Sequence, residues 1–507
     1  MRPPEEEITA LVDRCLLIGM PGTTLAPQYC DWLAEGLGGV ILFARNIVDQ
    51  TQLAALSGQL RAAAGPELII ALDEEGGDVT RLHARDGSPT PGNLALGAID
   101  DTDLTRATAR GIGSELAAAG ISLNLAPVAD VNTCAENPII GTRSFGADPE
   151  LVARHAVAYL HGLAEAGIPG CAKHFPGHGE AGVDSHLALP TVTGQLEAHL
   201  VPFRAVIAAG IRAIMCAHIR YPALDDKPAT LSPAILTGLL REQLGFTGAI
   251  ITDSLTMQAI SGPVGLGPGC VQALAAGADV LCLNAGYDGA RAARAELVAA
   301  VVSGEVPLSR LQEAADRAGA LARAGAGAIS VPSASRGHGG SNDAQARPST
   351  SVAPGPQWRG ELARRVLLVD LPAGPPPGVP FVIELAKPRG GVEPSTSSLL
   401  QIMHQAHTDV AGVRLYDRSA GIDLRQAVAE ALHRAADRPV VLVVADAHRR
   451  PEHREAIKQV RAHHPGGVVV GTGTTADAHL APGAYLGARS GARVNLQAVA
   501  GLLLTPQ

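Results

Sequence analysis

Side chains that can do chemistry recur in this sequence just after short apolar runs. Lys173 and His174 end one run, and Asp253 directly follows another. Asp184 and His186 stand two residues apart in the glycine-rich loop after His174. Carboxylates and imidazoles serve as nucleophiles and as general acids and bases, so we expect catalysis built on them. Further polar residues that follow such runs are Asp73, Glu74, Glu75, Asp130, Asn132, Arg143 and His218.

The apolar runs indicate parallel strands covered on both faces. Segments between them, such as 103–119 and 149–166, carry apolar residues three and four apart, as helices do. Eight such units in roughly 300 residues predict an α/β fold, a (β/α)₈ TIM-like barrel. An open doubly wound sheet is the competing architecture. The runs are 15–20, 39–43, 68–72, 123–127, 170–174, 213–217, 248–252 and 279–283.

A barrel presents its functional residues at the carboxyl ends of its strands. The polar residues named above all stand at such ends or in the loops that follow them. Any one of them is explained equally well as a helix cap or a solvated strand end. Their common position predicts an active site on this face.

The chain divides into two domains by composition. We expect the catalytic barrel over 1–325, a linker rich in Gly, Pro and Ser over 326–360, and a smaller α/β (αβα) sandwich over 361–507. In the sandwich, Gly471-Thr-Gly473 follows a strand-like run, and we interpret it as an ordinary loop rather than a phosphate site. The strand-like runs of this domain are 366–370, 380–385, 440–445 and 467–471.

Composition favours a globular enzyme. Hydrophobic residues make up 46% of the chain and charged residues 18%, and the net charge of −9 argues against a nucleic-acid or membrane partner. The seven cysteines form no C-x-x-C pair, which suits a reducing compartment. No signal-like segment or spanning apolar run is present. We expect a cytoplasmic protein that is a monomer or homodimer.

The motifs resemble those of bacterial β-N-acetylglucosaminidases of glycoside hydrolase family 3, in the two-domain form. The most specific match is Lys173-His-Phe-Pro-Gly-His-Gly179 followed by Asp184-Ser-His186. The resemblance extends from about residue 15 to 286, and Glu74 departs from the amide-bearing residue often expected there. Further matching motifs are Gly39-Val-Ile-Leu-Phe-Ala-Arg-Asn46, Asp73-Glu-Glu-Gly-Gly77, Ala126-Pro-Val-Ala-Asp-Val-Asn132 and Ile251-Thr-Asp253-Ser-Leu-Thr-Met257.

The resemblance implies a retaining exo-hydrolase that removes terminal β-linked GlcNAc. Retention requires a carboxylate below the anomeric carbon and a proton donor beside the leaving oxygen. By resemblance Asp253 is the nucleophile and His186 the acid/base, while Asp184 can accept one imidazole N–H and stabilise the imidazolium. The implied substrates are small oligosaccharides, either muropeptide fragments from peptidoglycan turnover or chitobiose.

The resemblance also assigns sugar-binding residues. Two histidines receive supporting roles, His178 in stabilising a turn and His218 behind the site. We expect no cofactor and no metal, since Pro176 and Gly177 prevent a helix that would aim His174 and His178 at one ion. The implied sugar-binding residues are Asp73, Arg81, Asp130, Arg143, Lys173 and His174.

Two alternative functions remain open from the sequence. A neutral histidine does not repel a phosphate dianion, so a β-N-acetylglucosaminide phosphorylase with the same nucleophile and Asp–His pair is one. A non-catalytic sugar-binding protein on the same scaffold is the other, although the presence together of Asp253, Asp184 and His186 counts against it.

Overall fold

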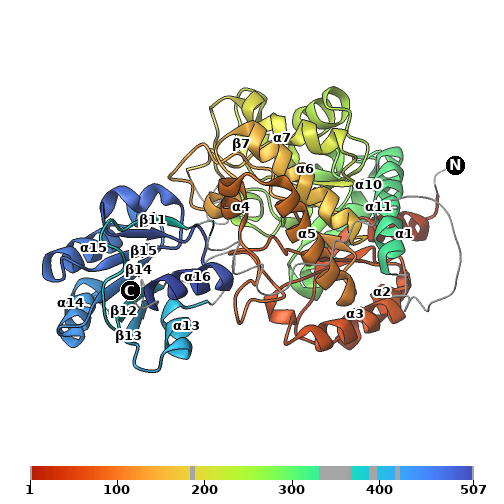
Figure 1. The fold of residues 1–507 in the computed structure, drawn as a ribbon. Coiled ribbons are helices and arrows are strands. Elements are labelled where there is room, and N and C mark those ends of the chain that lie inside the picture. The colour runs from red at the N-terminus through yellow and green to blue at the C-terminus, as the bar shows by residue number, and fades with distance from the viewer. Residues whose placement is uncertain are drawn as a thin grey trace, which may run out of the picture.

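The computed structural model describes residues 3–182, 189–329, 365, 367–386, 397–416 and 423–504. Asp184 and His186 lie outside the described residues, and so does 330–364, which includes most of the predicted linker. The described chain forms two α/β units that lie side by side, with the second drawn in blue (Figure 1).

Eight parallel strands close into a barrel in the first unit. Five pair in the order β10-β1-β2-β3-β4 and three in the order β5-β6-β9. Parallel bridges from Asn124 to Gly170 and from Ile251 to Val280 join the two sets at both edges. Each predicted run contains one strand, which confirms the barrel and excludes the open sheet. The strands are β1 (Leu16–Gly19), β2 (Gly39–Leu42), β3 (Ile69–Leu72), β4 (Leu123–Asn124), β5 (Cys171–Phe175), β6 (Ala213–Cys216), β9 (Ala249–Thr252) and β10 (Leu281–Leu283).

The strands are apolar throughout because both sides of the barrel wall are buried. Alternate residues of a strand face opposite sides. In β3, Ile69 and Ala71 pack inside the barrel, whereas Ile70 and Leu72 pack under the surrounding helices. Leu321 of α11 lines a cavity with Ala249, the first residue of β9, so this helix covers the amino ends of the strands.

Helices carry the chain between the barrel strands, and aspartate caps fix the starts of α3, α5 and α6. Asp101 accepts a hydrogen bond from Leu104 N at the start of α5, and Asp148 accepts one from Leu151 N at the start of α6. Among the helices that the structure describes, none is both long and apolar enough to cross a membrane. The main helices are α1 (Glu5–Arg14), α2 (Pro27–Glu35), α3 (Gln50–Ala64), α4 (Asn93–Ile99), α5 (Thr102–Ala118), α6 (Pro149–Glu165), α7 (Leu196–Ala208), η4 (Ala234–Gln243), α8 (Gln258–Ser261), α9 (Leu266–Ala276), α10 (Gly286–Ser303) and α11 (Leu308–Ile329).

The second unit is a six-stranded sheet covered by helices on both faces. Its order is β11-β16-β15-β14-β12-β13, and every pair is parallel except β11 with β16. Phe381 and Ile383 of β12 pack with α14 and α15, whereas Val382 packs with α13 and α16. The predicted strands are confirmed, and β13 and β16 are additional. The elements are β11 (Leu368–Asp370), β12 (Phe381–Ala386), α13 (Leu399–Ala406), β13 (Ala411–Tyr416), α14 (Leu424–Ala435), β14 (Val440–Val444), α15 (Pro451–His463), β15 (Val468–Gly471), β16 (Tyr485–Gly487) and α16 (Arg493–Leu504).

A histidine of the second unit contacts the barrel. His448 lies in the short turn η5 (Ala447–Arg449) after β14. Its Nδ1 lies 2.6 Å from Asp477 Oδ1, and its Nε2 lies 3.0 Å from the carbonyl oxygen of Ala135 in the barrel. Both partners only accept hydrogen bonds, so both contacts form together when the ring is an imidazolium. The hydrogen bond to Asp477 raises the pKa of His448 above its usual value, in spite of partial burial and with support from Asp446.

This contact predicts a pH-dependent stability. Because the folded-state pKa is raised, the stabilisation is complete below the unfolded pKa of about 6.5 and is lost as pH rises through the folded value. His448→Gln should therefore reduce the urea-unfolding free energy more at pH 6 than at pH 9. The control is His463→Gln, which changes an exposed histidine bonded to a carbonyl of its own helix. An equal effect of His448→Gln at both pH values would contradict this assignment.

Candidate active site

A cavity of about 350 Å³ opens at the carboxyl ends of the barrel strands. Six of the nine predicted site residues line it, and Asp130 lies behind it. Asp184 and His186 lie outside the described residues, so their position is not described. The predicted residues in the lining are Asp73, Arg81, Arg143, Lys173, His174 and Asp253.

Barrel strands position these side chains. Asp73 directly follows β3, Lys173 and His174 lie in β5, and Asp253 directly follows β9. Arg143 instead ends the short helical turn η2 (Gly141–Arg143), in the loop after β4. Groups on strands are held more rigidly than groups on free loops, and catalysis is sensitive to displacements of about 1 Å. Arg143, like Arg81 in the loop after β3, thus needs support from outside the strands.

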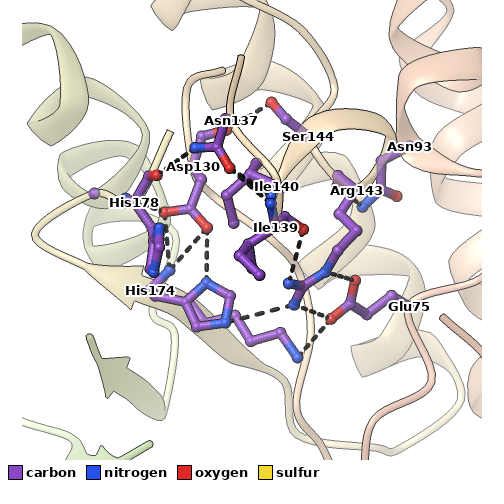
Figure 2. A network of polar contacts seen from close by, with 12 residues as sticks. Glu75, Asn93, Asp130, Asn137, Ile139, Ile140, Arg143, Ser144, His174 and His178 are labelled. Atoms are coloured by element: carbon purple, nitrogen blue, oxygen red, sulfur yellow. Dashed lines mark hydrogen bonds and ion pairs between the residues drawn. The ribbon is translucent and has the colours of Figure 1, made fainter. Parts of the chain in front are cut away.

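A buried cluster of charges lies at the centre of the site. Lys173 Nζ lies 2.7 Å from Asp73 Oδ1 and 2.7 Å from Glu75 Oε1. Arg143 binds Glu75 through two parallel hydrogen bonds, of 2.9 Å from Nε and 2.7 Å from Nη2 (Figure 2). Arg81 Nη2 lies 3.5 Å from the other oxygen of Asp73. Each buried charge therefore has an opposite charge beside it, as a low-dielectric site requires.

These pairs keep every member of the cluster ionised. Burial works against the charged form of Asp73, but Lys173 and Arg81 outweigh it and hold the pKa of Asp73 below its usual value. Arg143 and Lys173 likewise overcome burial and lower the pKa of Glu75. Burial disfavours the charged form of Lys173, but Asp73 and Glu75 outweigh it and raise the pKa of Lys173. Glu75 likewise overcomes burial and raises the pKa of Arg143. At neutral pH the cavity therefore offers fixed charges of both signs to a ligand.

Asp130 holds His174 and the loop that follows it. Its two oxygens accept hydrogen bonds from His174 Nδ1 at 2.7 Å and from the backbone N–H of His178 at 2.7 Å. The proton on Nδ1 leaves Nε2 to face Arg143 Nη2, which lies 3.5 Å away (Figure 2). Burial disfavours the Asp130 carboxylate, yet His174 and His178 hold its pKa below the usual value. Asp130 thus orients a lining residue and does not itself line the cavity.

Asp253 presents a half-buried carboxylate to the cavity. Its backbone N–H donates to Cys216 O at 3.1 Å, and its Oδ1 accepts from the backbone N–H of Ser254 at 2.7 Å. His218 lies behind this segment, where its Nε2 lies 2.9 Å from Ser254 O and its Nδ1 2.8 Å from Thr230 Oγ1. These contacts fix the carboxylate at the end of β9.

Apolar side chains complete the cavity wall. A cavity with apolar walls and a few convergent polar groups is typical of small-ligand sites. Phe43 and Met257 fall within the family-like motifs, so the sequence offered a signal for them, whereas Asn284 and Gln258 carried none. The apolar lining residues are Ile41, Phe43, Val79, Leu125, Ile139, Met215, Met257 and Cys282.

Two neighbouring glutamates have opposite roles. Glu75, which the sequence placed on the active-site face without a specific role, lines the cavity and binds Lys173 and Arg143. Glu74 is buried on the other side, where its Oε2 accepts hydrogen bonds from the backbone N–H groups of Arg81 and Leu82 at 2.8 and 3.0 Å. Burial raises the pKa of Glu74. The presence of Glu74 in place of an amide-bearing residue therefore affects the backbone at Arg81 and Leu82, and not the cavity lining.

His178 has the contacts of a turn residue. Its carbonyl accepts from Asn137 Nδ2 at 2.8 Å, in addition to the bond from its N–H to Asp130. Burial, with the nearby charge of His174, lowers the pKa of its imidazole to about 4. The ring is therefore neutral at physiological pH. Within the described part of the chain, no group of three or more His, Cys, Asp or Glu side chains is placed to hold a metal ion.

Asp130 should contribute strongly to stability. Asp130→Asn replaces one accepting oxygen with an N–H₂ group that faces N–H donors, and we expect a loss of about 2–3 kcal/mol in unfolding free energy. Urea unfolding at pH 7 measures it. The matched control is Asp100→Asn, since Asp100 pairs with Arg154 at the surface and should lose under about 1 kcal/mol. Equal losses in the two variants would refute the role given to Asp130.

Comparisons with known proteins agree with this geometry. The family model for the glycosyl hydrolase family 3 N terminal domain matches residues 21–321. Over 278 residues the chain is 41% identical to a beta-hexosaminidase of Xylella fastidiosa (strain M23), with 52% of this chain and 82% of the relative covered.

Two solved structures are also similar. One is a glycoside hydrolase family 3 beta-N-acetylglucosaminidase from Paenibacillus sp. str. FPU-7, with a TM-score of 0.84, 31% identity, and 98% of this chain and 96% of that chain covered. The other is NagZ from Neisseria gonorrhoeae in complex with N-trifluoroacetyl-D-glucosamine, with a TM-score of 0.52, 34% identity, and 61% of this chain and 97% of that chain covered. Of these two, the Paenibacillus enzyme is matched across both domains.

Proposed function

We propose that this chain, which belongs to glycosyl hydrolase family 3, hydrolyses terminal β-linked N-acetylglucosamine with retention at the anomeric carbon. Its relatives are beta-hexosaminidases, and the chain is a glycoside hydrolase of that kind. The observation that carries the proposal is the cavity in which Asp253 and the Lys173–Glu75–Arg143 cluster face the same space. A sugar that is bound to this cluster would have the carboxylate of Asp253 beside it.

In the first step, an oxygen of Asp253 forms a bond to C1 of the sugar. The bond from C1 to the leaving oxygen breaks, and that oxygen takes a proton from the acid/base. The N–H of Ser254 binds Oδ1 of Asp253 and so holds the carboxylate in place for the attack. In the second step water attacks C1, gives its proton back to the acid/base and releases Asp253.

We assign the proton transfer to His186, with Asp184 as the partner that stabilises its imidazolium. Both residues lie outside the described residues, and the assignment rests on the motif. The flanking chain supports it. Ala181 N donates to His178 O at 3.2 Å after β5, and Val192 N donates to Arg220 O at 2.9 Å after β6. Residues 181 and 192, which flank the undescribed residues, are therefore both bonded to loops that follow barrel strands.

The charged cluster is suited to hold the sugar. Asp73 can accept hydrogen bonds from two hydroxyl groups, while Lys173 and Arg143 can donate to hydroxyl or acetamido oxygens. Arg81 adds a further donor along the wall, and Nε2 of His174 can accept a hydrogen bond there. Because these groups are ordered by one another, binding requires little rearrangement of the protein. We propose small GlcNAc-terminated oligosaccharides as substrates, including muropeptide fragments and chitobiose.

Replacement of Asp253 should abolish turnover and leave the fold intact. Asp253→Ala removes the atom that bonds to C1, and we expect a loss in kcat of about 10⁴-fold or more on an aryl β-N-acetylglucosaminide. Circular dichroism and thermal unfolding check the fold. A 2-acetamido-5-fluoro glycosyl fluoride should label Asp253 in the wild type, as peptide mapping would show. A label on Asp73 or Glu75 instead would refute the assignment.

Replacement of His186 should affect substrates according to their leaving group. A nitrophenolate leaves without protonation, whereas a sugar alcohol needs a proton. His186→Ala should therefore slow the hydrolysis of chitobiose by about 10²–10⁴-fold and the hydrolysis of the aryl substrate far less. Equal losses on both substrates would count against the proton-transfer role.

The same assays with added phosphate distinguish hydrolysis from phosphorolysis, since the latter yields sugar 1-phosphate. Binding without any turnover would indicate a sugar-binding protein.

A further inference from the structure

We propose that the second domain positions Arg143 for substrate, through a carboxylate bridge at Asp78. The inference rests on the sugar-binding role proposed for Arg143. Asp78 Oδ2 accepts a hydrogen bond from Thr142 Oγ1 at 2.5 Å. Asp78 Oδ1 accepts from Gly491 N at 2.5 Å and from Ser490 Oγ at 3.2 Å. One barrel side chain thus joins the residue next to Arg143 to the loop between β16 and α16.

Asp78 and Glu75 act together on the Arg143 segment. They lie three residues apart on a tight turn, which Glu75 N and Val79 O close with a 3.0 Å hydrogen bond. Glu75 binds the guanidinium of Arg143, and Asp78 binds the hydroxyl of Thr142. One turn of the barrel therefore holds two consecutive residues of η2. Hydrogen bonds to a carboxylate are stronger than those between neutral groups, which suits them to this task.

The turn that carries Asp78 is tightly packed and has no space for a side chain at Gly77. Gly77 has φ +62°, and a Cβ atom there would lie 2.4 Å from Gly92 Cα and 3.3 Å from Ser490 Oγ. The second domain therefore packs directly against the backbone beside Asp78. Ser490 is itself fully buried at this contact. A shift of the 490–491 loop would move Asp78, and with it Thr142.

A second loop of the same domain holds the chain that leads to Arg143. His448 contacts Ala135 O, and Arg449 Nη1 donates to Glu136 O at 3.2 Å. The stretch from 135 to 142 is thus bound to the second domain directly at 135 and 136, and through Asp78 at 142. By contrast, Lys173 and His174 belong to a barrel strand. Among the groups of the charged cluster, Arg143 depends on the second domain through its loop, and Glu75 through the turn that it shares with Asp78.

The comparison with the gonococcal NagZ indicates that a second domain is not present in every similar protein. Of that solved chain, 97% is matched by 61% of this one, so it consists of little beyond a barrel. A barrel can therefore be complete by itself. In the present chain, residues 448 and 449 of the second domain bond to the loop that carries Arg143. Residues 490 and 491 bond to Asp78, which in turn holds that loop.

The expected kinetic effect separates positioning from folding. Arg143 would bind the sugar in both the ground state and the transition state, so its displacement raises KM more than it lowers kcat. Partial unfolding reduces the amount of active enzyme instead, which lowers the measured kcat and leaves KM unchanged.

The experiment measures KM and kcat of the full chain on an aryl β-N-acetylglucosaminide. Asp78→Ala and Thr142→Val should each raise KM by about 10-fold and change kcat by less than about 3-fold. The double variant should have about the same KM as each single variant, because each substitution removes the Asp78–Thr142 hydrogen bond. Asp78→Asn keeps an accepting oxygen and should restore part of the affinity. The control is Glu165→Ala, which removes an ion-paired carboxylate that contacts Arg106 and Arg110 on α5, and it should leave both constants unchanged.

Each failure has its own signature. If Arg143→Ala leaves KM unchanged, the sugar-binding role of Arg143 is wrong. If Arg143→Ala raises KM but Asp78→Ala does not, the role of Arg143 stands and the bridge to the second domain is refuted. A lower kcat at unchanged KM in Asp78→Ala, together with a lower melting temperature, would also refute it, since that result marks a purely structural contact. Additive KM effects of Asp78→Ala and Thr142→Val would refute the shared contact.

Discussion

The site depends on the need to neutralise Lys173 inside the barrel. An ammonium group that is removed from water must have opposite charges beside it, and the loss of one partner from a buried pair costs about 3–5 kcal/mol. Asp73 and Glu75 meet this need at 2.7 Å each, from the end of a strand that is not adjacent to the strand of Lys173. The ion pairs therefore fix the rim of the barrel across its opening.

The same requirement accounts for the order of the remaining groups. Glu75 is shared between Lys173 and Arg143, and Arg143 in turn faces His174, whose other nitrogen is held by Asp130. Polar groups that are fixed before the substrate arrives need no reorientation when it binds or reacts. The cavity is thus preorganised by its own charge balance, with β3, β5 and the loop after β4 each contributing one part.

The sequence predicted the barrel well because both sides of its wall are buried, so each strand is an uninterrupted apolar run. It predicted less in the second domain, where β13 is only partly buried and β16 is three residues long. The pairing inside the site was also beyond reach, since Glu75 and Arg143 are 68 residues apart. Glu74 and Glu75 illustrate the limit: adjacent residues point in opposite directions, and only the fold decides which one faces the cavity.

Charge balance also argues against Asp73 and Glu75 as the nucleophile of the proposed mechanism. Asp73 and Glu75 share their negative charge with Lys173 and with an arginine each, so their oxygens are engaged and their pKa values are lowered. A carboxylate in that state accepts hydrogen bonds from hydroxyl groups but is a weak nucleophile. Asp253 lies across the cavity at the end of β9, where Oδ1 is bound by the neutral N–H of Ser254. This difference supports the proposed roles, with Asp73 and Glu75 as binding groups and Asp253 as the reacting carboxylate.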